Sequence, residues 1–288
     1  MDSSSILVTG ASGFIGAAVV EELIRQGQHF TCLGRVQKSH SNILCENFNL
    51  EQETEIEELL ERITPKLVLH LAWKGIPDLS EEMSRINYNN SLNFIRSALR
   101  FGAKRIVIAG SCLEYGEIEG QVSEEDLTVN PTPFGRVKSE LFQTALHEAK
   151  DKTCQVLSGR IFFAYGLGQR AGALIPSLLR TIESGGVVTL RSPGASQDFV
   201  EVSDVASALV LLLLNESAQE GVYNIGSGIL TPTDTIAAKM SKILGRNYES
   251  SFNGVPKGLF ANNNKLRKLG WSSKLSIEAG LERYTLGQ

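Results

Sequence analysis

The chain has 288 residues, of which 42% are hydrophobic and 21% are charged, and its formal net charge is −4. This length is enough for one large hydrophobic core or two smaller lobes, and the composition is ordinary for a soluble globular protein. Because the net charge is slightly negative and lysine and arginine form no block, we expect no nucleic-acid partner.

The apolar runs and the cysteines argue against export, a membrane span and a metal site. Residues 1–5 lack the basic and apolar regions of a signal peptide. The most apolar run, residues 206–214, is far shorter than the roughly 20 residues that cross a bilayer. The four cysteines are scattered without a CxxC pair. We therefore expect a cytoplasmic protein with no membrane partner, no disulfide framework and no metal.

Up to residue 160, apolar runs of strand length alternate with amphipathic runs of helical length. The strands are predicted over residues 6–9, 29–33, 67–71, 105–109 and 155–160. The helices are predicted over residues 13–26, 51–63, 81–100 and 133–149. Such alternation is typical of βαβ units and predicts an α/β fold with a Rossmann-like, doubly wound parallel sheet.

The pattern changes after Tyr165, where shorter elements follow one another. They are predicted over residues 173–183, 187–191, 199–202, 203–214, 222–225 and 234–244. No linker rich in proline, serine or charge separates the two halves. We therefore predict a first domain over residues 1–165 and a smaller α+β lobe over residues 166–288, with the chain crossing between them.

Three glycines follow the first predicted strand at the spacing TGxxGxxG, and they are Gly10, Gly13 and Gly16. In a strand–turn–helix unit, the first glycine permits the tight turn, the second lets the backbone approach a pyrophosphate, and the third lets the helix pack on the strand. The helix N-terminus then presents N–H groups to the phosphates. The alternative is a glycine-rich turn without a ligand. The predicted dinucleotide-binding residues of this loop are Gly10, Ser12, Gly13, Phe14, Ile15 and Gly16.

Arg35 follows the second predicted strand, where a dinucleotide fold meets the adenosine ribose. An acidic residue there binds the ribose 2′-hydroxyl, whereas an arginine accommodates a 2′-phosphate. Arg35 therefore favours NADP as the cofactor, with NAD as the second choice. The alternative is a solvated loop arginine.

Four later segments add to the pattern of the glycine loop. They are His70-Leu71-Ala72-Trp73, similar to HLAA; residues 110–116, similar to SSxxVYG; residues 130–138, similar to PxxxYxxxK; and residues 197–206, similar to RDFVxVxDVA. Together they resemble the extended short-chain dehydrogenase/reductase superfamily, in its NAD-dependent epimerase/dehydratase family of nucleotide-sugar epimerases and reductases. The resemblance covers nearly the whole chain.

The resemblance implies roles for single residues. The backbone of Leu71 and Ala72 would pass the nicotinamide-side ribose and phosphates. Lys138 would bind the nicotinamide ribose and lower the pKa of a catalytic tyrosine, while the Ser111 hydroxyl would donate to a sugar oxygen. The substrate contacts implied are Ser111, Cys112, Arg160 and Gln197.

Phe134 stands where the family has its catalytic tyrosine, so the ring is kept and the proton donor is missing. Three explanations stay open. The first is that the chain is an engineered Tyr-to-Phe variant. The second is that it is a natural enzyme that uses Ser111 or water as the proton donor. The third is that it is a binding protein that has lost its catalytic activity.

The segment after Ser111 argues against one branch of the family. The 4,6-dehydratases resemble TDEVYG there, with an acid and a base directly after the hydroxyl, where this chain has Cys112 and Leu113. Glu114 lies one residue after the position of the dehydratase glutamate. On an extended backbone, neighbouring side chains point to opposite faces. We therefore expect no dehydratase.

The sequence thus predicts an NAD(P)-dependent reductase or epimerase that acts at a keto or hydroxyl carbon of a nucleoside-diphosphate sugar. Residues 1–165 would hold the cofactor and residues 166–288 the sugar nucleotide. Ser111, Phe134 and Lys138 form the predicted catalytic set, and Arg35 favours a reductase. The alternative is a non-catalytic NADP-binding or sensor protein. The resemblance also implies a homodimer.

Overall fold

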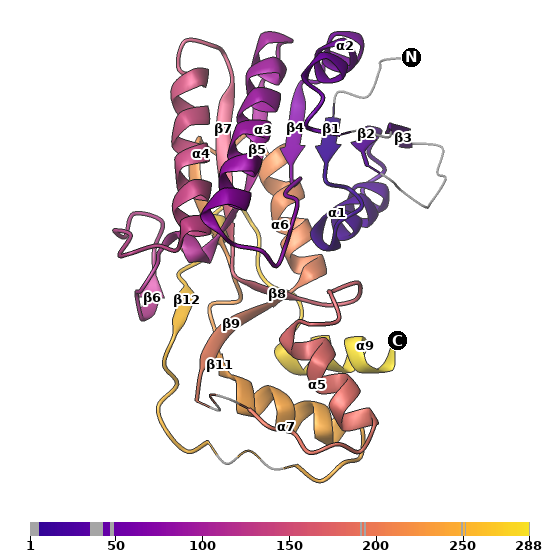
Figure 1. The fold of residues 1–288 in the computed structure, drawn as a ribbon, viewed down its shortest axis with the longest axis vertical. Coiled ribbons are helices and arrows are strands. Elements are labelled where there is room, and N and C mark those ends of the chain that lie inside the picture. The colour runs from indigo at the N-terminus through magenta and orange to yellow at the C-terminus, as the bar shows by residue number, and fades with distance from the viewer. Residues whose placement is uncertain are drawn as a thin grey trace. The chain divides into compact units, whose positions relative to one another are not determined.

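The computed structural model describes residues 6–34, 43–46, 49–190, 192, 194–248, 250 and 252–287. The chain folds as two compact units and passes between them several times (Figure 1). The first unit contains Met1–Glu117, Leu127–Arg160 and Ala206–Tyr223. The second unit contains Ile118–Asp126, Ile161–Val205 and Asn224–Gln288.

A sheet built mainly by the first unit confirms the predicted doubly wound architecture. Its order, among the described residues, is β10-β7-β5-β4-β1-β2-β3, and β1 pairs in parallel with both β2 and β4. The chain order therefore reverses around β1, and sheets of this kind bind ligands beyond the carboxyl ends of the strands at such a reversal, here those of β1 and β4. The strands are β1 (Ile6–Thr9), β2 (Phe30–Leu33), β3 (Ile43–Glu46), β4 (Leu67–His70), β5 (Arg105–Ser111), β7 (Gln155–Ile161) and β10 (Gly221–Ile225).

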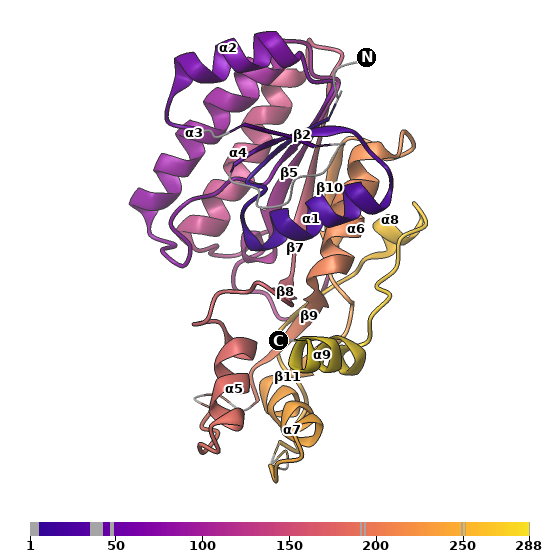
Figure 2. The same cartoon turned by 90° about the vertical axis from the view of Figure 1, so that its right-hand side faces the viewer.

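Helices cover both faces of this sheet. Figure 2 shows α2 (Glu53–Ile63), α3 (Glu81–Arg100) and α4 (Pro133–Ala149) on one face, and α1 (Phe14–Arg25) and α6 (Val202–Leu214) on the other. Apolar residues recur at helical spacing, so that each helix turns one stripe to the sheet. On α2 that stripe includes Ile56, Leu60 and Ile63, which are buried in a core shared with α3, α4 and the strands.

The second unit has its own smaller core. Its three-stranded sheet has the order β11-β9-β8, and β12 pairs with β6. Tyr165, Phe199 and Leu281 pack in this core with residues of α5 and α7. The elements are β6 (Gly120–Val122), β8 (Phe163–Tyr165), α5 (Leu174–Glu183), β9 (Ser196–Glu201), β11 (Leu230–Pro232), α7 (Thr233–Ile243), β12 (Leu259–Ala261), α8 (Asn264–Arg267) and α9 (Ile277–Leu286).

Several short elements differ from the prediction. Residues 187–190 form neither helix nor strand, although the run was predicted as an element. The edge strand β3, the short strands β6, β8, β11 and β12, and the helices α8 and α9 were not predicted. Three- and four-residue strands depend on a partner strand more than on local sequence. In the described part of the chain, no helix is long and apolar enough to cross a membrane.

Candidate functional site

The glycine loop forms a tight turn between β1 and α1. Gly10 has φ +73°, and a Cβ atom there would lie 2.7 Å from the Ala72 nitrogen. A Cβ atom on Gly16 would lie 2.0 Å from the Gly10 carbonyl oxygen, whereas one on Gly13 would come no closer than 3.3 Å to that atom. Gly10 and Gly16 are therefore required by the turn itself, and Gly13 is not.

The N-terminus of α1 lies directly behind this turn. Gly13 is its N-cap and contributes no side-chain hydrogen bond, so the N–H groups of the first turn have no side-chain cap. Ser12 and Gly13 are exposed, and Phe14 and Ile15 are partly exposed. An uncapped helix N-terminus behind an open glycine turn fits a pyrophosphate, which accepts hydrogen bonds from such N–H groups.

The segment after β4 lies against the same loop. Leu71 N donates to the Thr9 carbonyl oxygen at 3.3 Å, and Ala72 N donates to Thr9 Oγ1 at 3.2 Å. Asn87 of α3 fixes the next turn, because its side chain accepts from Lys74 N at 2.8 Å and donates to the Lys74 carbonyl oxygen at 3.0 Å. The two residues predicted to border the cofactor, Leu71 and Ala72, therefore adjoin the glycine turn.

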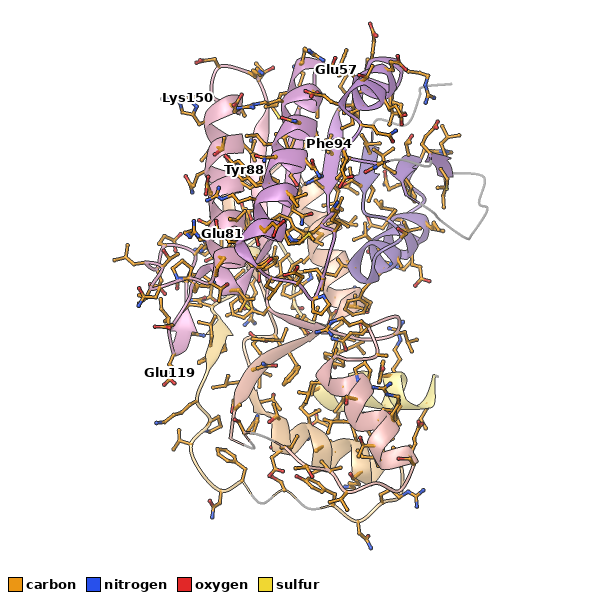
Figure 3. All side chains as sticks on the ribbon, viewed as in Figure 1. Glu57, Glu81, Tyr88, Phe94, Glu119 and Lys150 are labelled. Carbon is orange, nitrogen blue, oxygen red and sulfur yellow. The ribbon has the colours of Figure 1, made fainter. Side chains whose placement is uncertain are left out.

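His70 is a buried structural residue. Its Nδ1 lies 2.8 Å from Thr9 Oγ1, and its Nε2 lies 2.9 Å from Ser91 Oγ. The ring stacks on Phe94 of α3, labelled in Figure 3, with the ring centroids 5.1 Å apart. Burial, with a smaller contribution from the Lys138 charge, lowers the pKa of His70 to about 3. The imidazole is therefore neutral at working pH and ties β1 to β4 and α3.

Ser111 caps a short 3₁₀ turn over Cys112–Glu114 at the end of β5. Its Oγ accepts from Leu113 N at 3.2 Å, and Ser111 N donates to Glu114 Oε1 at 2.8 Å. That bond leaves the hydroxyl hydrogen of Ser111 for a ligand oxygen. The extended backbone assumed in the sequence argument against a dehydratase is therefore wrong, because the segment turns here and brings Glu114 inward.

Glu114 forms a buried ion pair that the sequence analysis missed. Its Oε2 accepts from Arg160 Nε at 2.9 Å, and the two side chains are 1% and 7% exposed. The Arg160 guanidinium also lies 4.5 Å from the ring centre of Tyr115. Burial raises the pKa of Glu114, and the Arg160 charge opposes that shift. Arg160, predicted to contact the substrate, thus holds the Ser111 turn; its substrate contact stays a prediction.

Phe134 and Lys138 lie in the first turns of α4. Thr132 caps this helix by accepting from Gly135 N at 3.2 Å, and Pro133 begins it. A Cβ atom on Gly135 would lie 2.0 Å from the Leu113 carbonyl oxygen, so only glycine lets α4 pack this closely on the Ser111 turn. The three predicted catalytic residues therefore come from two elements in direct contact.

Lys138 is buried and enclosed by aromatic rings. Its Nζ donates to the Ala109 carbonyl oxygen at 2.8 Å. The ring centre of Trp73 lies 3.8 Å from Nζ and that of Phe134 lies 5.7 Å away. Burial lowers the pKa of Lys138 to about 7, and the Glu114 carboxylate opposes this. Trp73 was not predicted as a site residue. It replaces the second alanine of HLAA, and this replacement was the feature of the sequence that could have identified it.

We compared the chain with known protein families. A model of the NAD dependent epimerase/dehydratase family matches residues 6–226. The chain belongs to that family.

Members of the epimerase/dehydratase family align with the chain over almost its whole length. The dTDP-4-dehydro-6-deoxyglucose reductase of Escherichia coli is 26% identical, with 97% of this chain and 96% of the relative covered. GDP-L-fucose synthase 1 of Arabidopsis thaliana is 28% identical, with 98% and 92% covered. The solved structure of MoeE5 in complex with UDP-glucose and NAD is 26% identical at a TM-score of 0.83, with 98% and 97% covered. Relatives of this chain are thus nucleotide-sugar epimerases and reductases.

Three further residues were predicted to bind a ligand, and their binding roles stay predictions. Arg35 lies outside the described residues. Gln197 lies on β9 in the second unit, paired with Thr231 of β11. Cys112 is buried within the 3₁₀ turn. In the described ranges, no group of histidine, cysteine and acidic side chains is suited to a metal ion.

Proposed function

We propose that the chain is an NAD(P)-dependent reductase or epimerase that acts at a keto or hydroxyl carbon of a nucleoside-diphosphate sugar. The observation that carries the proposal is the convergence of the glycine turn, Ala72, Ser111 and Lys138 at the carboxyl ends of β1, β4 and β5. Relatives that carry out such reactions align over nearly the whole chain.

The cofactor site is assigned to residues of the first unit and to Arg35. The turn around Gly13 and the N–H groups of α1 would hold the pyrophosphate, Leu71 and Ala72 would border the nicotinamide side, and Lys138 would contact the ribose. Arg35 would accommodate the 2′-phosphate of NADP, and solved relatives are described with NAD. A bound nicotinamide dinucleotide accepts or supplies hydride at the sugar carbon.

The protein residues orient the sugar and stabilise charge on its reacting oxygen. The Ser111 hydroxyl would donate to that oxygen, because Leu113 N occupies only an acceptor position of Oγ. Glu114 and Arg160 keep the Ser111 turn in place. Phe134 excludes water but cannot transfer a proton. Gln197 and Cys112 would add substrate contacts.

A second function is favoured by one observation, the missing phenol at Phe134. A protein of this design that only binds NADP and a sugar nucleotide would keep the glycine turn and have no need of a proton donor. A cytoplasmic location and a homodimer also belong to the proposal, by analogy with the family.

The test combines binding and turnover. Calorimetry with NADPH, NADH and a panel of nucleoside-diphosphate sugars measures affinity. Absorbance at 340 nm follows reduction of 4-keto sugars, and proton NMR of the 4-hydroxyl sugars follows epimerisation. Oxidation of the reduced cofactor or interconversion of epimers supports the enzyme. Tight binding without either reaction supports the binding protein.

A further inference from the structure

Trp73 connects the glycine turn to the catalytic lysine. It follows Ala72, whose backbone is in contact with Gly10, and its ring centre lies 3.8 Å from Lys138 Nζ. Its indole also meets the ring of Phe134 edge to face, with the centroids 5.5 Å apart and the planes at 82°. Two residues that depart from the family pattern, Trp73 and Phe134, are therefore in contact with each other and face the same ammonium group.

The surroundings of Lys138 contain little charge. Among the described residues, Lys138 forms no ion pair, and its one hydrogen bond goes to the neutral Ala109 carbonyl. Glu114 faces it from the 3₁₀ turn, but that carboxylate is hydrogen bonded to Arg160 and to Ser111 N. His70 faces it from β4 and is neutral. Two aromatic rings therefore border the ammonium and attract a cation through their quadrupoles, in addition to the charge of Glu114.

We propose that the Lys138 ammonium, held between Trp73 and Phe134, is the proton donor of this chain, and that Trp73 is the residue that positions it. The inference rests on the proposed function. During reduction, a Lys138 N–H bond breaks and an O–H bond forms on the sugar carbonyl oxygen. The hydride that a reduced nicotinamide dinucleotide supplies forms the C–H bond and provides the electron pair. Lys138 is left as a neutral amine and takes a proton from solvent.

The alternatives in the site are weaker acids. An indole N–H such as that of Trp73 can donate a hydrogen bond but does not release its proton, and a serine hydroxyl such as that of Ser111 is a much weaker acid than an ammonium. A general acid is most effective when its pKa lies near the working pH, and burial places that of Lys138 at about 7. In a relative with a tyrosine at position 134, the lysine would need only to lower the pKa of the phenol, which would donate the proton.

The first test measures the pKa of Lys138 directly and does not depend on enzymatic activity. Protein labelled with ¹⁵N-lysine is titrated by NMR, and the Nζ signal missing from Lys138→Arg is assigned to Lys138. We expect this signal to titrate near pH 7. Trp73→Ala should raise its midpoint by at least one pH unit, because hydration of the ammonium then outweighs the lost attraction of the indole ring. Trp73→Phe keeps an aromatic face and should stay within half a unit of the unmodified protein. A midpoint near 10 in the unmodified protein overturns the inference.

The second test separates proton transfer from binding. Reduction by the unmodified protein should slow as pH rises through 7, because the ammonium is lost. Lys138→Arg keeps the positive charge but does not release a proton, so cofactor affinity should stay within about threefold while turnover falls at least tenfold and the slowing near pH 7 disappears. Turnover of Lys138→Arg with the pH dependence of the unmodified protein contradicts the inference and leaves the proposed function intact. If no substrate reacts with the unmodified protein, both the inference about Lys138 and the proposed enzymatic function are wrong.

Discussion

Trp73 and Phe134 meet edge to face at a centroid distance of 5.5 Å, and both rings lie close to the Lys138 ammonium. Edge-to-face contact is a favoured geometry of aromatic pairs and fixes both rings. Phe134 is 7% exposed, so the ring is held firmly at the position of the family tyrosine. A hydroxyl added to this ring would be carried by a side chain whose orientation is already fixed.

Phe134→Tyr should raise turnover. The added phenol lies one helical turn from Lys138, whose charge would lower the pKa of the phenol toward working pH. General acid–base catalysis contributes about 10²–10⁴-fold, and we expect a gain of about 10²-fold because the proposed proton donation by Lys138 would supply part of this effect without the phenol. Steady-state kinetics at saturating cofactor measures it.

The control is cofactor affinity. The dissociation constant for the dinucleotide should change little in Phe134→Tyr, because the glycine turn and Lys138 are unaltered, whereas Lys138→Ala should weaken binding in either background. A flat turnover on every sugar nucleotide that binds would show that a phenol at position 134 takes no part in proton transfer, or that the chain is not an enzyme.

Two glycines of the loop should respond differently to alanine. In Gly13→Ala, the added methyl group would come no closer than 3.3 Å to the Gly10 carbonyl oxygen, so the protein should keep its fold. The methyl group should keep the pyrophosphate away from the backbone and lower the dinucleotide affinity at least tenfold. Gly16→Ala places the methyl group 2.0 Å from the same oxygen and should destabilise the protein by about 3 kcal/mol. Urea denaturation and calorimetry measure the two effects. Unchanged affinity in a folded Gly13→Ala variant would rule out the assigned pyrophosphate site.

Arg35 should make the protein prefer NADPH to NADH. A charge-assisted contact between arginine and phosphate contributes about 1.5–3 kcal/mol, which corresponds to roughly tenfold or more in affinity. Calorimetry with both cofactors measures the ratio, and Arg35→Ala should bring it close to one. Equal affinities in the unmodified protein, or tighter binding of NADH, would refute the assignment.

His70 should make the protein sensitive to acid. Its pKa is about 3 in the folded state and about 6.5 in the unfolded chain, so the unfolded state binds more protons between these values and stability falls as pH drops through that window. Between pH 7 and pH 4, the unmodified protein should lose about 3 kcal/mol more of its free energy of unfolding than His70→Gln does.

Urea denaturation at the two pH values gives the His70 difference, and His147→Gln, on the exposed side of α4, controls for the loss of a histidine. Parallel losses in His70→Gln and the unmodified protein would mean that the imidazole titrates at the same pH in the folded and unfolded states.

The sequence by itself determined the alternation of strands and helices in the first unit and its parallel sheet. Ile6–Thr9, Glu81–Arg100 and Pro133–Ala149 form as predicted, to the residue. These elements are long or strongly apolar, and their period is visible locally. The sequence also determined the glycine turn and the spacing of Phe134 and Lys138, because one helical turn separates them whatever surrounds the helix.

Tertiary structure alone decided the contacts between distant segments. The ion pair of Glu114 with Arg160 joins residues 46 positions apart, and the placement of Trp73 over Lys138 depends on how the turn after β4 packs on α4. The pairing of β10 with β7 likewise brings a late strand into the first sheet. Local periodicity carries no information about such pairs, since burial and partner choice arise only when the elements pack together.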